Sequence, residues 1–168
     1  NVYVAGLPRL DRWATLAPVT QDHNLIVVLS FRSGYGDGLE TEFFSLLISL
    51  IRNKKTSHSV FIKSKNEIDT LEIRRKLSFV GDSFAVDHKV ELYDLLPRAG
   101  KIIGFNSLSL LEALLTRARI LIPNWYSSDD RKKMLHRANT EDLVEFFNDE
   151  DSLVRASLSS MPFDAKMP

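Results

Sequence analysis

The sequence predicts a doubly wound α/β fold, in which a parallel sheet of about five strands carries helices on both faces. Residues 24–31 (NLIVVLSF) form a nearly continuous apolar, β-branched run, which is typical of a parallel strand buried on both faces. Strand-like and helix-like segments then alternate along the chain, roughly every 20 to 30 residues. With 168 residues, of which 44% are hydrophobic and 26% charged, the chain has the length and composition of one globular domain.

The first half of the chain repeats a cycle of strand, loop and helix. A loop with three glycines follows the first strand, and apolar residues at helical spacing predict a helix over residues 41–53. Next come a predicted strand at 59–64 (SVFIKS), a charged amphipathic helix at 67–80 and a strand at 84–87 (FAVD). A short helical turn is expected within residues 90–100.

The second half continues the alternation and ends in a polar tail. A strand is predicted at 101–105 (KIIGF), a helix at 107–118 and a strand at 119–125 (RILIPNW). From Ser127 onward the charged pattern predicts two or three surface helices, with residues 139–142 (NTED) as a helix start.

Two polar loops are expected to meet at one edge of this sheet. In the strand order 3-2-1-4-5 the first strand lies beside the fourth, and ligands bind beyond the carboxyl ends of the strands at that reversal. The loops that leave these two strands cover residues 30–38 and 105–109, and both are rich in small polar residues. We therefore expect a binding site between them.

The residues of these loops suit an anion. A helix that starts near Ser107 offers free backbone N–H groups, and Ser107 and Ser109 add hydroxyls. Across the crevice lie a guanidinium, hydroxyls and a backbone that a ligand can approach closely, from Ser30, Arg32, Ser33 and Gly34. The plainer alternative is that Ser107 only caps the helix and that the glycines form a turn.

Two further charged residues are candidates for contacts with a ligand. Glu112 lies in the otherwise apolar helix after the second loop, where a carboxylate can accept hydrogen bonds from ribose hydroxyls. Lys63 ends the second strand, and its ammonium group can approach a phosphate. The alternatives are a structural or solvated glutamate and a solvating lysine.

The composition excludes several classes of protein. Lys and Arg together number 22, as do Asp and Glu, so no overall field favours nucleic acid as a partner. Cysteine is absent, which excludes disulfides and thiol chemistry and suits the cytoplasm. No apolar run is long enough for a membrane helix, and no signal peptide is apparent. Because the first residue is Asn, we expect a piece of a longer protein.

Common catalytic and cofactor motifs are not matched. The glycine loop GYGDG lacks the lysine of a P-loop, and the dinucleotide fingerprint is missing as well. The four histidines have no metal-binding spacing, so we expect no metal site, and the serine-hydrolase elbow is incomplete.

Three stretches of the chain resemble the C-terminal, nucleotide-binding half of glycosyltransferases of the GT-B architecture and of their relatives, the CDP-glycerol glycerophosphotransferases and UDP-N-acetylglucosamine 2-epimerases. They are residues 4–11 (VAGLPRLD), 61–67 (FIKSKNE) and 92–123 (LYDLLPRAGKIIGFNSLSLLEALLTRARILIP). The resemblance implies a Rossmann-like domain over residues 21–160, after an interdomain linker at 1–20 and before a tail at 161–168. The His-Pro that often follows the family's lysine is absent, since Ser64 and Lys65 follow Lys63 here.

The resemblance implies a site for a nucleotide sugar. The donor phosphate would lie by Asn106, Ser107 and Ser109, against the loop from Ser30 to Gly34. Glu112 would face the ribose, and the base would rest near His88, Val90 and Leu92. The resemblance implies neither a cofactor nor a metal, and it does not indicate which residues are catalytic.

The closest subgroup is the transferases of bacterial surface polysaccharides. The resemblance then implies a separate N-terminal domain that binds the acceptor, a cytoplasmic enzyme that could associate peripherally with the inner face of the membrane, and no sugar transfer by this chain alone. Two alternatives stay open. One is an epimerase-like half, for which Asp37 is the obvious loop carboxylate, and the other is a non-catalytic module that docks on a partner protein.

Overall fold

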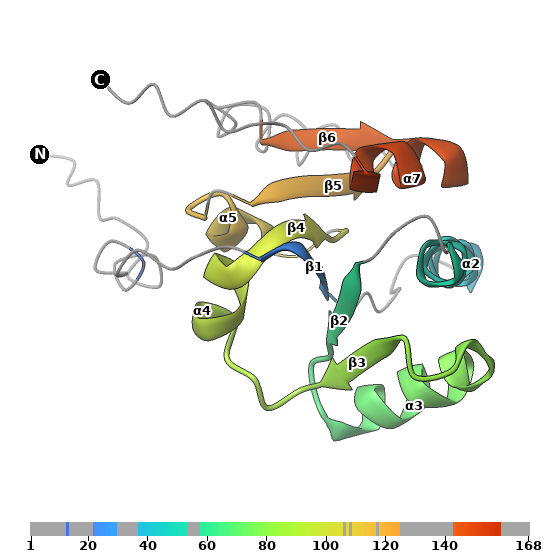
Figure 1. Ribbon diagram of the computed structural model, residues 1–168. Helices are drawn as coiled ribbons and strands as arrows, with labels where there is room; N and C mark the ends of the chain where they lie inside the picture. The colour runs from blue at the N-terminus through green and yellow to red at the C-terminus, as the bar shows by residue number, and fades with distance from the viewer. Residues whose placement is uncertain are drawn as a thin grey trace, which may run out of the picture.

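The computed structural model describes residues 13, 22–29, 37–53, 58–105, 107, 109–116, 118–124 and 143–158. These residues form an α/β structure built on a single parallel sheet (Figure 1). The sheet has six strands in the order β3-β2-β1-β4-β5-β6. The predicted order of the first five strands is confirmed, and β6 extends the sheet beyond β5.

The strands lie close to the positions that the apolar runs predict. They are β1 (Asp22–Leu29), β2 (Ser59–Lys63), β3 (Phe84–Asp87), β4 (Ala99–Ile103), β5 (Arg119–Pro123) and β6 (Val144–Phe147). Every neighbouring pair is parallel. Val28 of β1 pairs with Ile103 of β4, so the chain leaves both strands at the same edge of the sheet. The reversal of strand order therefore falls where the sequence predicts it.

Helices cover both faces of the sheet, as expected for a doubly wound fold. One apolar cluster joins β1 and β2 to α2 (Asp37–Arg52), α3 (Glu67–Leu77) and α7 (Glu150–Leu158). A second cluster joins the opposite face to α4 (Leu92–Leu95), the 3-10 helix η3 (Leu96–Arg98) and α5 (Ser109–Ala113). Figure 1 shows the two groups of helices on opposite sides of the strands.

The C-terminal region differs from the prediction. Residues 144–147 form a strand where the charged tail predicts surface helix, and only α7 is helical in the described part of this tail. The segment VEFF has the β-branched and aromatic residues that suit a strand, and its pairing with β5 decides its conformation. The predicted helix start at 139–142 lies outside the described residues.

The helix after β4 is shorter than predicted. It spans Ser109–Ala113 instead of 107–118. A side-chain hydrogen bond from Thr116 accompanies the end of the helix. The Thr116 hydroxyl donates to the carbonyl oxygen of Ala113 at 2.7 Å, and the chain then turns toward β5. A helix of five residues has only a small macrodipole, so the predicted attraction of its amino end for an anion is weak.

None of the helices in the described ranges is both long and apolar enough to cross a membrane.

Candidate functional site

The side chain of Lys63 links the carboxyl end of β2 to the residues that follow β3. Its ammonium group donates to the carbonyl oxygens of Ser64 and His88, both at 2.8 Å. The backbone N–H of Ser64 donates to the carbonyl oxygen of Asp87 at 3.2 Å. An ammonium group has three N–H donors, so one remains for a ligand at this edge. Burial lowers the pKa of Lys63, whereas the charges of Glu91 and Asp87 act to raise it.

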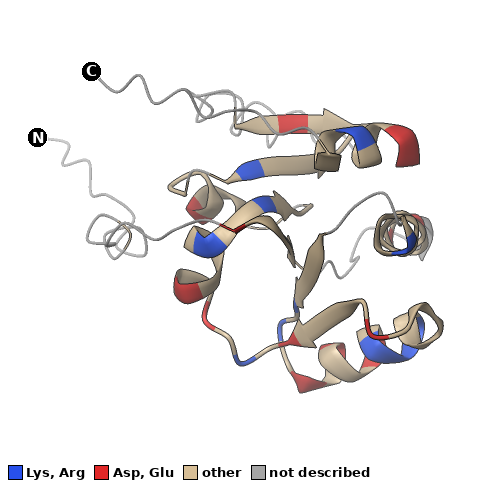
Figure 2. Ribbon diagram, viewed as in Figure 1, with Lys and Arg blue, Asp and Glu red and all other residues tan. Residues whose placement is uncertain are grey.

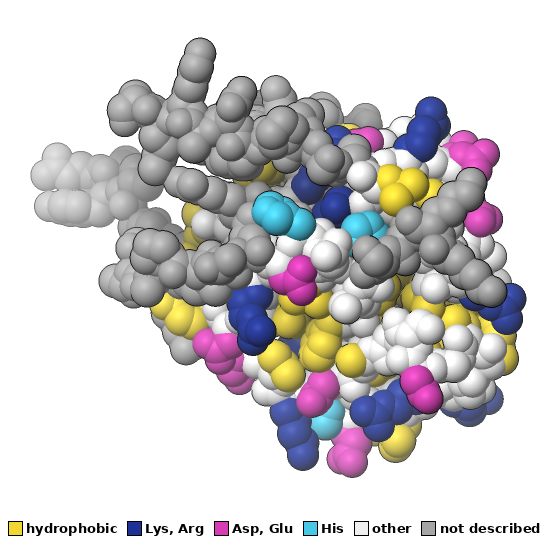
Figure 3. Space-filling model, in the orientation of Figure 1, with side chains coloured by type: hydrophobic (Ala, Val, Ile, Leu, Met, Phe, Trp, Pro, Cys, Tyr) yellow, Lys and Arg dark blue, Asp and Glu magenta, His cyan; other side chains and the backbone are white. Residues whose placement is uncertain are grey.

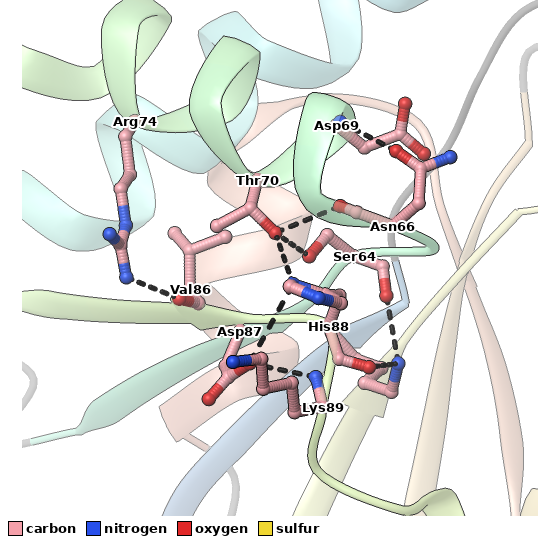
Figure 4. Close-up of polar contacts among 10 residues, drawn as sticks. Ser64, Asn66, Asp69, Thr70, Arg74, Val86, Asp87, His88 and Lys89 are labelled. Atoms are coloured by element: carbon pink, nitrogen blue, oxygen red, sulfur yellow. Dashed lines mark hydrogen bonds and ion pairs between the residues drawn. The ribbon is translucent and has the colours of Figure 1, made fainter.

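The ring of His88 contacts a buried hydrogen-bond network of two hydroxyl groups. The Ser64 and Thr70 hydroxyl oxygens lie 2.6 Å apart, and both side chains are buried. The Thr70 hydroxyl donates to the carbonyl oxygen of Asn66 at 2.9 Å. The same oxygen lies 3.2 Å from Nδ1 of His88. Figure 4 shows these groups converging from β2, α3 and the segment after β3.

The donors and acceptors of this network determine the form of the His88 ring. The Thr70 hydroxyl has one hydrogen, and it is donated to the Asn66 carbonyl, which can only accept. The two lone pairs of the Thr70 oxygen must then accept from the Ser64 hydroxyl and from Nδ1–H of His88. The neutral ring therefore carries its proton on Nδ1 and presents Nε2 as an acceptor. The side chain of His88 keeps 25% of its surface exposed, so a ligand can reach the ring.

Local turns hold the two ends of this network in place. Asn66 caps α3, because its side-chain oxygen accepts from the N–H of Asp69 at 2.9 Å. Asp87 ends β3 and accepts from the N–H of Lys89 at 2.7 Å, which lowers the pKa of Asp87. Its carboxylate lies 3.9 Å from Nδ1 of His88, so the two form an ion pair when the ring is protonated.

The predicted phosphate loops are only partly visible. Ser30, Arg32, Ser33, Gly34 and Asn106 lie outside the described residues. Ser107 is half-buried, and its hydroxyl oxygen accepts from the N–H of Ser109 at 3.2 Å. Its carbonyl oxygen accepts from the N–H of Leu110 at 3.1 Å. Ser107 thus caps the turn that leads into α5, which was the plainer of the two sequence interpretations.

Three other predicted residues pack within the protein. Glu112 is only 5% exposed, so its carboxylate does not line an open surface. Val90 and Leu92 are half-buried and pack against the apolar cluster beneath α4 and η3. Of the predicted site residues that the structure describes, Lys63 and His88 are brought into direct contact, and both lie at the carboxyl edge of β2 and β3.

The sequence interpretation missed Ser64 and Thr70. Each looks like an ordinary polar residue, and neither forms a motif with the other. The signal that could have found Thr70 is its place after the Asn66 cap, because the fourth residue of a helix lies one turn from the cap and faces the same side.

The described ranges hold no group of three or more His, Asp or Glu side chains that could bind a metal ion. At this edge the described side chains offer an ammonium donor from Lys63 and an imidazole acceptor from His88.

Comparisons with known proteins find a similarity in structure. No family model matches the chain. No curated protein matches its sequence. A solved structure matches with a TM-score of 0.55 and 12% sequence identity: a Listeria monocytogenes protein assigned as a UDP-N-acetylglucosamine 2-epimerase. The match covers 92% of this chain and 39% of that protein, so the chain spans about two-fifths of its length. At this identity the match establishes only a fold shared with that protein, a Rossmann-like α/β domain.

Proposed function

We propose that this chain is the nucleotide-sugar-binding half of an enzyme of the GT-B architecture. The observation that carries the proposal is the pairing of Lys63 and His88 at the carboxyl edge of β2 and β3. This edge is where doubly wound sheets bind nucleotides. The fold that the chain shares with the Listeria protein supports the same class of ligand.

The two side chains suit different parts of a nucleotide. Lys63 keeps one N–H donor for a phosphate or a ribose oxygen. His88 presents Nε2 as an acceptor, which matches an N–H group on the edge of a base. Uracil carries such a donor at N3 and cytosine at N4, but guanine carries donors at N1 and N2 as well, so Nε2 alone does not select the base. The likeness to a protein assigned as a UDP-sugar epimerase favours a pyrimidine nucleotide.

The remaining parts of the reaction belong to the full-length enzyme. We propose that an N-terminal domain binds the acceptor and supplies the general base, and that the enzyme transfers a glycosyl group to a bacterial surface polysaccharide. Ser107 and Ser109 follow β4 and are expected to lie on the phosphate side, with the loop from Ser30 to Gly34 and with Asn106.

An epimerase-like half is the second candidate, favoured by the assignment of the matched Listeria protein. Such an enzyme needs acidic groups around the anomeric carbon of the sugar. Asp37 is the candidate from the loop after β1, and it begins α2. The two candidates share the nucleotide-sugar site and differ in whether the full-length enzyme needs an acceptor.

Titration of the chain with UDP, CDP and GDP, followed by amide NMR, tests the shared part of the proposal. We expect UDP or CDP to shift the amide signals of residues 63–70 and 87–92 and those near Ser107. GDP should bind more weakly. Shifts that are absent for all three nucleotides, or that are confined to α7 and β6, would contradict the proposal and would favour a module that docks on a protein.

A further inference from the structure

The hydroxyl group of Thr70 is the point at which α3 contacts the ring of His88. Its oxygen lies 2.9 Å from the Asn66 carbonyl oxygen, 2.6 Å from the Ser64 hydroxyl oxygen and 3.2 Å from Nδ1 of His88. These contacts use its one hydrogen and both of its lone pairs. The Thr70 residue is only 6% exposed, so water does not replace these partners. Because a carbonyl holds the hydrogen, Thr70 meets the His88 ring as an acceptor.

The carboxylate of Asp87 favours the same form of the ring. It lies 3.9 Å from Nδ1 of His88, which is too far for a hydrogen bond but close enough for its charge to favour a proton on Nδ1. The carboxylate accepts from the backbone N–H of Lys89 at 2.7 Å, and this contact holds it in place. The hydrogen bond that one ring nitrogen makes decides which nitrogen carries the proton, so Thr70 is the residue that decides it here.

The ring also reaches the surface, where charges of both signs lie around it. The side chain of His88 keeps 25% of its surface exposed. Figure 3 shows a histidine side chain at the lower edge of this face, beside acidic and basic side chains. Figure 2 shows acidic and basic segments alternating from the end of β3 to α4. Charge alone therefore selects no ligand at this place, and the hydrogen-bonding form of the ring becomes important.

We propose that Thr70 is a positioning residue that sets the specificity of this edge. It keeps the proton of the neutral His88 ring on Nδ1, so Nε2 selects a ligand that presents an N–H or O–H donor. A ligand group that offers only lone pairs meets the lone pair of Nε2 and is disfavoured. The inference rests on the proposed nucleotide site, where the donor is an N–H group on the edge of the base.

Ser64 belongs to the same network but does not have this role. Ser64→Ala removes a buried donor to Thr70 but leaves the Thr70 oxygen able to accept from Nδ1–H of His88. Thr70→Val removes the acceptor itself. Both residues are buried, so both variants disturb the same packed region. A purely structural network would make the two variants alike, whereas a positioning role of Thr70 makes them differ.

The 15N signals of the His88 ring measure the position of its proton and need no ligand. At a pH where the ring is neutral, we expect the wild type, Thr70→Ser and Ser64→Ala to show a protonated Nδ1 and an unprotonated Nε2. In Thr70→Val the proton should move to Nε2, because Nδ1–H then lacks its acceptor whereas Nε2–H can donate to water. A proton on Nε2 in the wild type, or no change in Thr70→Val, would overturn the proposal. The wild-type signals alone can contradict it, so the test does not depend on whether the variants fold.

UDP and its N3-methyl derivative test the effect on the ligand. The methyl group removes the N3–H donor, and its bulk is the same for every variant, so the bulk cancels in a cycle of four affinities. We expect the methyl group to raise Kd at least about tenfold more in the wild type, Thr70→Ser and Ser64→Ala than in Thr70→Val. An equal effect of the methyl group in all four proteins would overturn the proposal. If the wild type does not bind UDP at all, the proposed nucleotide site fails, and the ring signals still decide whether Thr70 holds the proton on Nδ1.

Discussion

The Nδ1 atom of His88 lies 3.2 Å from the hydroxyl oxygen of Thr70, a residue that also accepts from the buried hydroxyl of Ser64. Thr70→Val keeps the shape of the side chain but removes this shared acceptor. We expect it to lower the free energy of unfolding by about 1–3 kcal/mol, because the Ser64 hydroxyl then stays buried without a partner. Urea unfolding measures the loss. Thr70→Ser keeps the hydroxyl and is the control, and equal losses in the two variants would contradict the network.

Lys63→Met should weaken nucleotide binding. The variant removes one charged donor from the proposed site, and a hydrogen bond to a charged group contributes about 1.5–3 kcal/mol, so we expect Kd for UDP or CDP to rise at least about tenfold. Isothermal titration calorimetry measures this change. Lys65→Met, two residues away and exposed, should leave Kd unchanged. A similar loss in both variants would show that only the general positive charge of this edge matters.

Gly100→Ala should destabilise the sheet. A Cβ atom at Gly100 would lie 2.6 Å from Cα of His23 and 2.8 Å from the carbonyl oxygens of Asp22 and His23. These are backbone atoms of β1, so the strands must move apart, and we expect a loss of about 1–3 kcal/mol. At Gly104 the added atom would meet mainly the flexible end of Leu110, so Gly104→Ala should cost less. Chemical unfolding compares the two, and a larger loss at Gly104 would contradict this packing.

His58 should make the protein less stable in acid. Burial, together with the Lys101 charge, lowers the pKa of His58 below the ordinary histidine value of 6.5. The unfolded chain therefore takes up this proton more readily than the folded chain, and folding stability falls as pH drops through about 6.5. His58→Gln keeps a donor for the Ser157 carbonyl but does not titrate. We expect the wild type to lose more stability than this variant between about pH 7.5 and 5.5. Equal losses would contradict the assignment.

The order of the sheet could be predicted because each buried parallel strand is marked by an apolar run within its own few residues. The segments 24–31, 59–64 and 119–125 are apolar on both faces, and each lies within a few residues of an observed strand. The strand β6 could not be predicted in the same way, because it is short and lies in a charged tail. Its pairing with β5 depends on a contact between distant parts of the chain.

For the candidate site, the sequence predicted the edge of the sheet on which it lies and two of its residues, Lys63 and His88. Lys63 and His88 follow strands that the sequence identifies, so their position at the carboxyl edge could be expected. The hydroxyl network under His88 could not, because Thr70 reaches the ring only after α3 packs beside β3. The burial of Lys101 was not foreseen either, since a lysine at a strand start normally points to solvent, and here neighbouring strands enclose it.

The most direct test of the nucleotide-binding account is a NOESY spectrum of the chain saturated with UDP or CDP. We expect contacts between the pyrimidine ring protons and the ring protons of His88, together with a shift of the His88 Nε2 signal that reports a new donor. Contacts of the base with another part of the chain, and an Nε2 signal that does not move, would contradict the account.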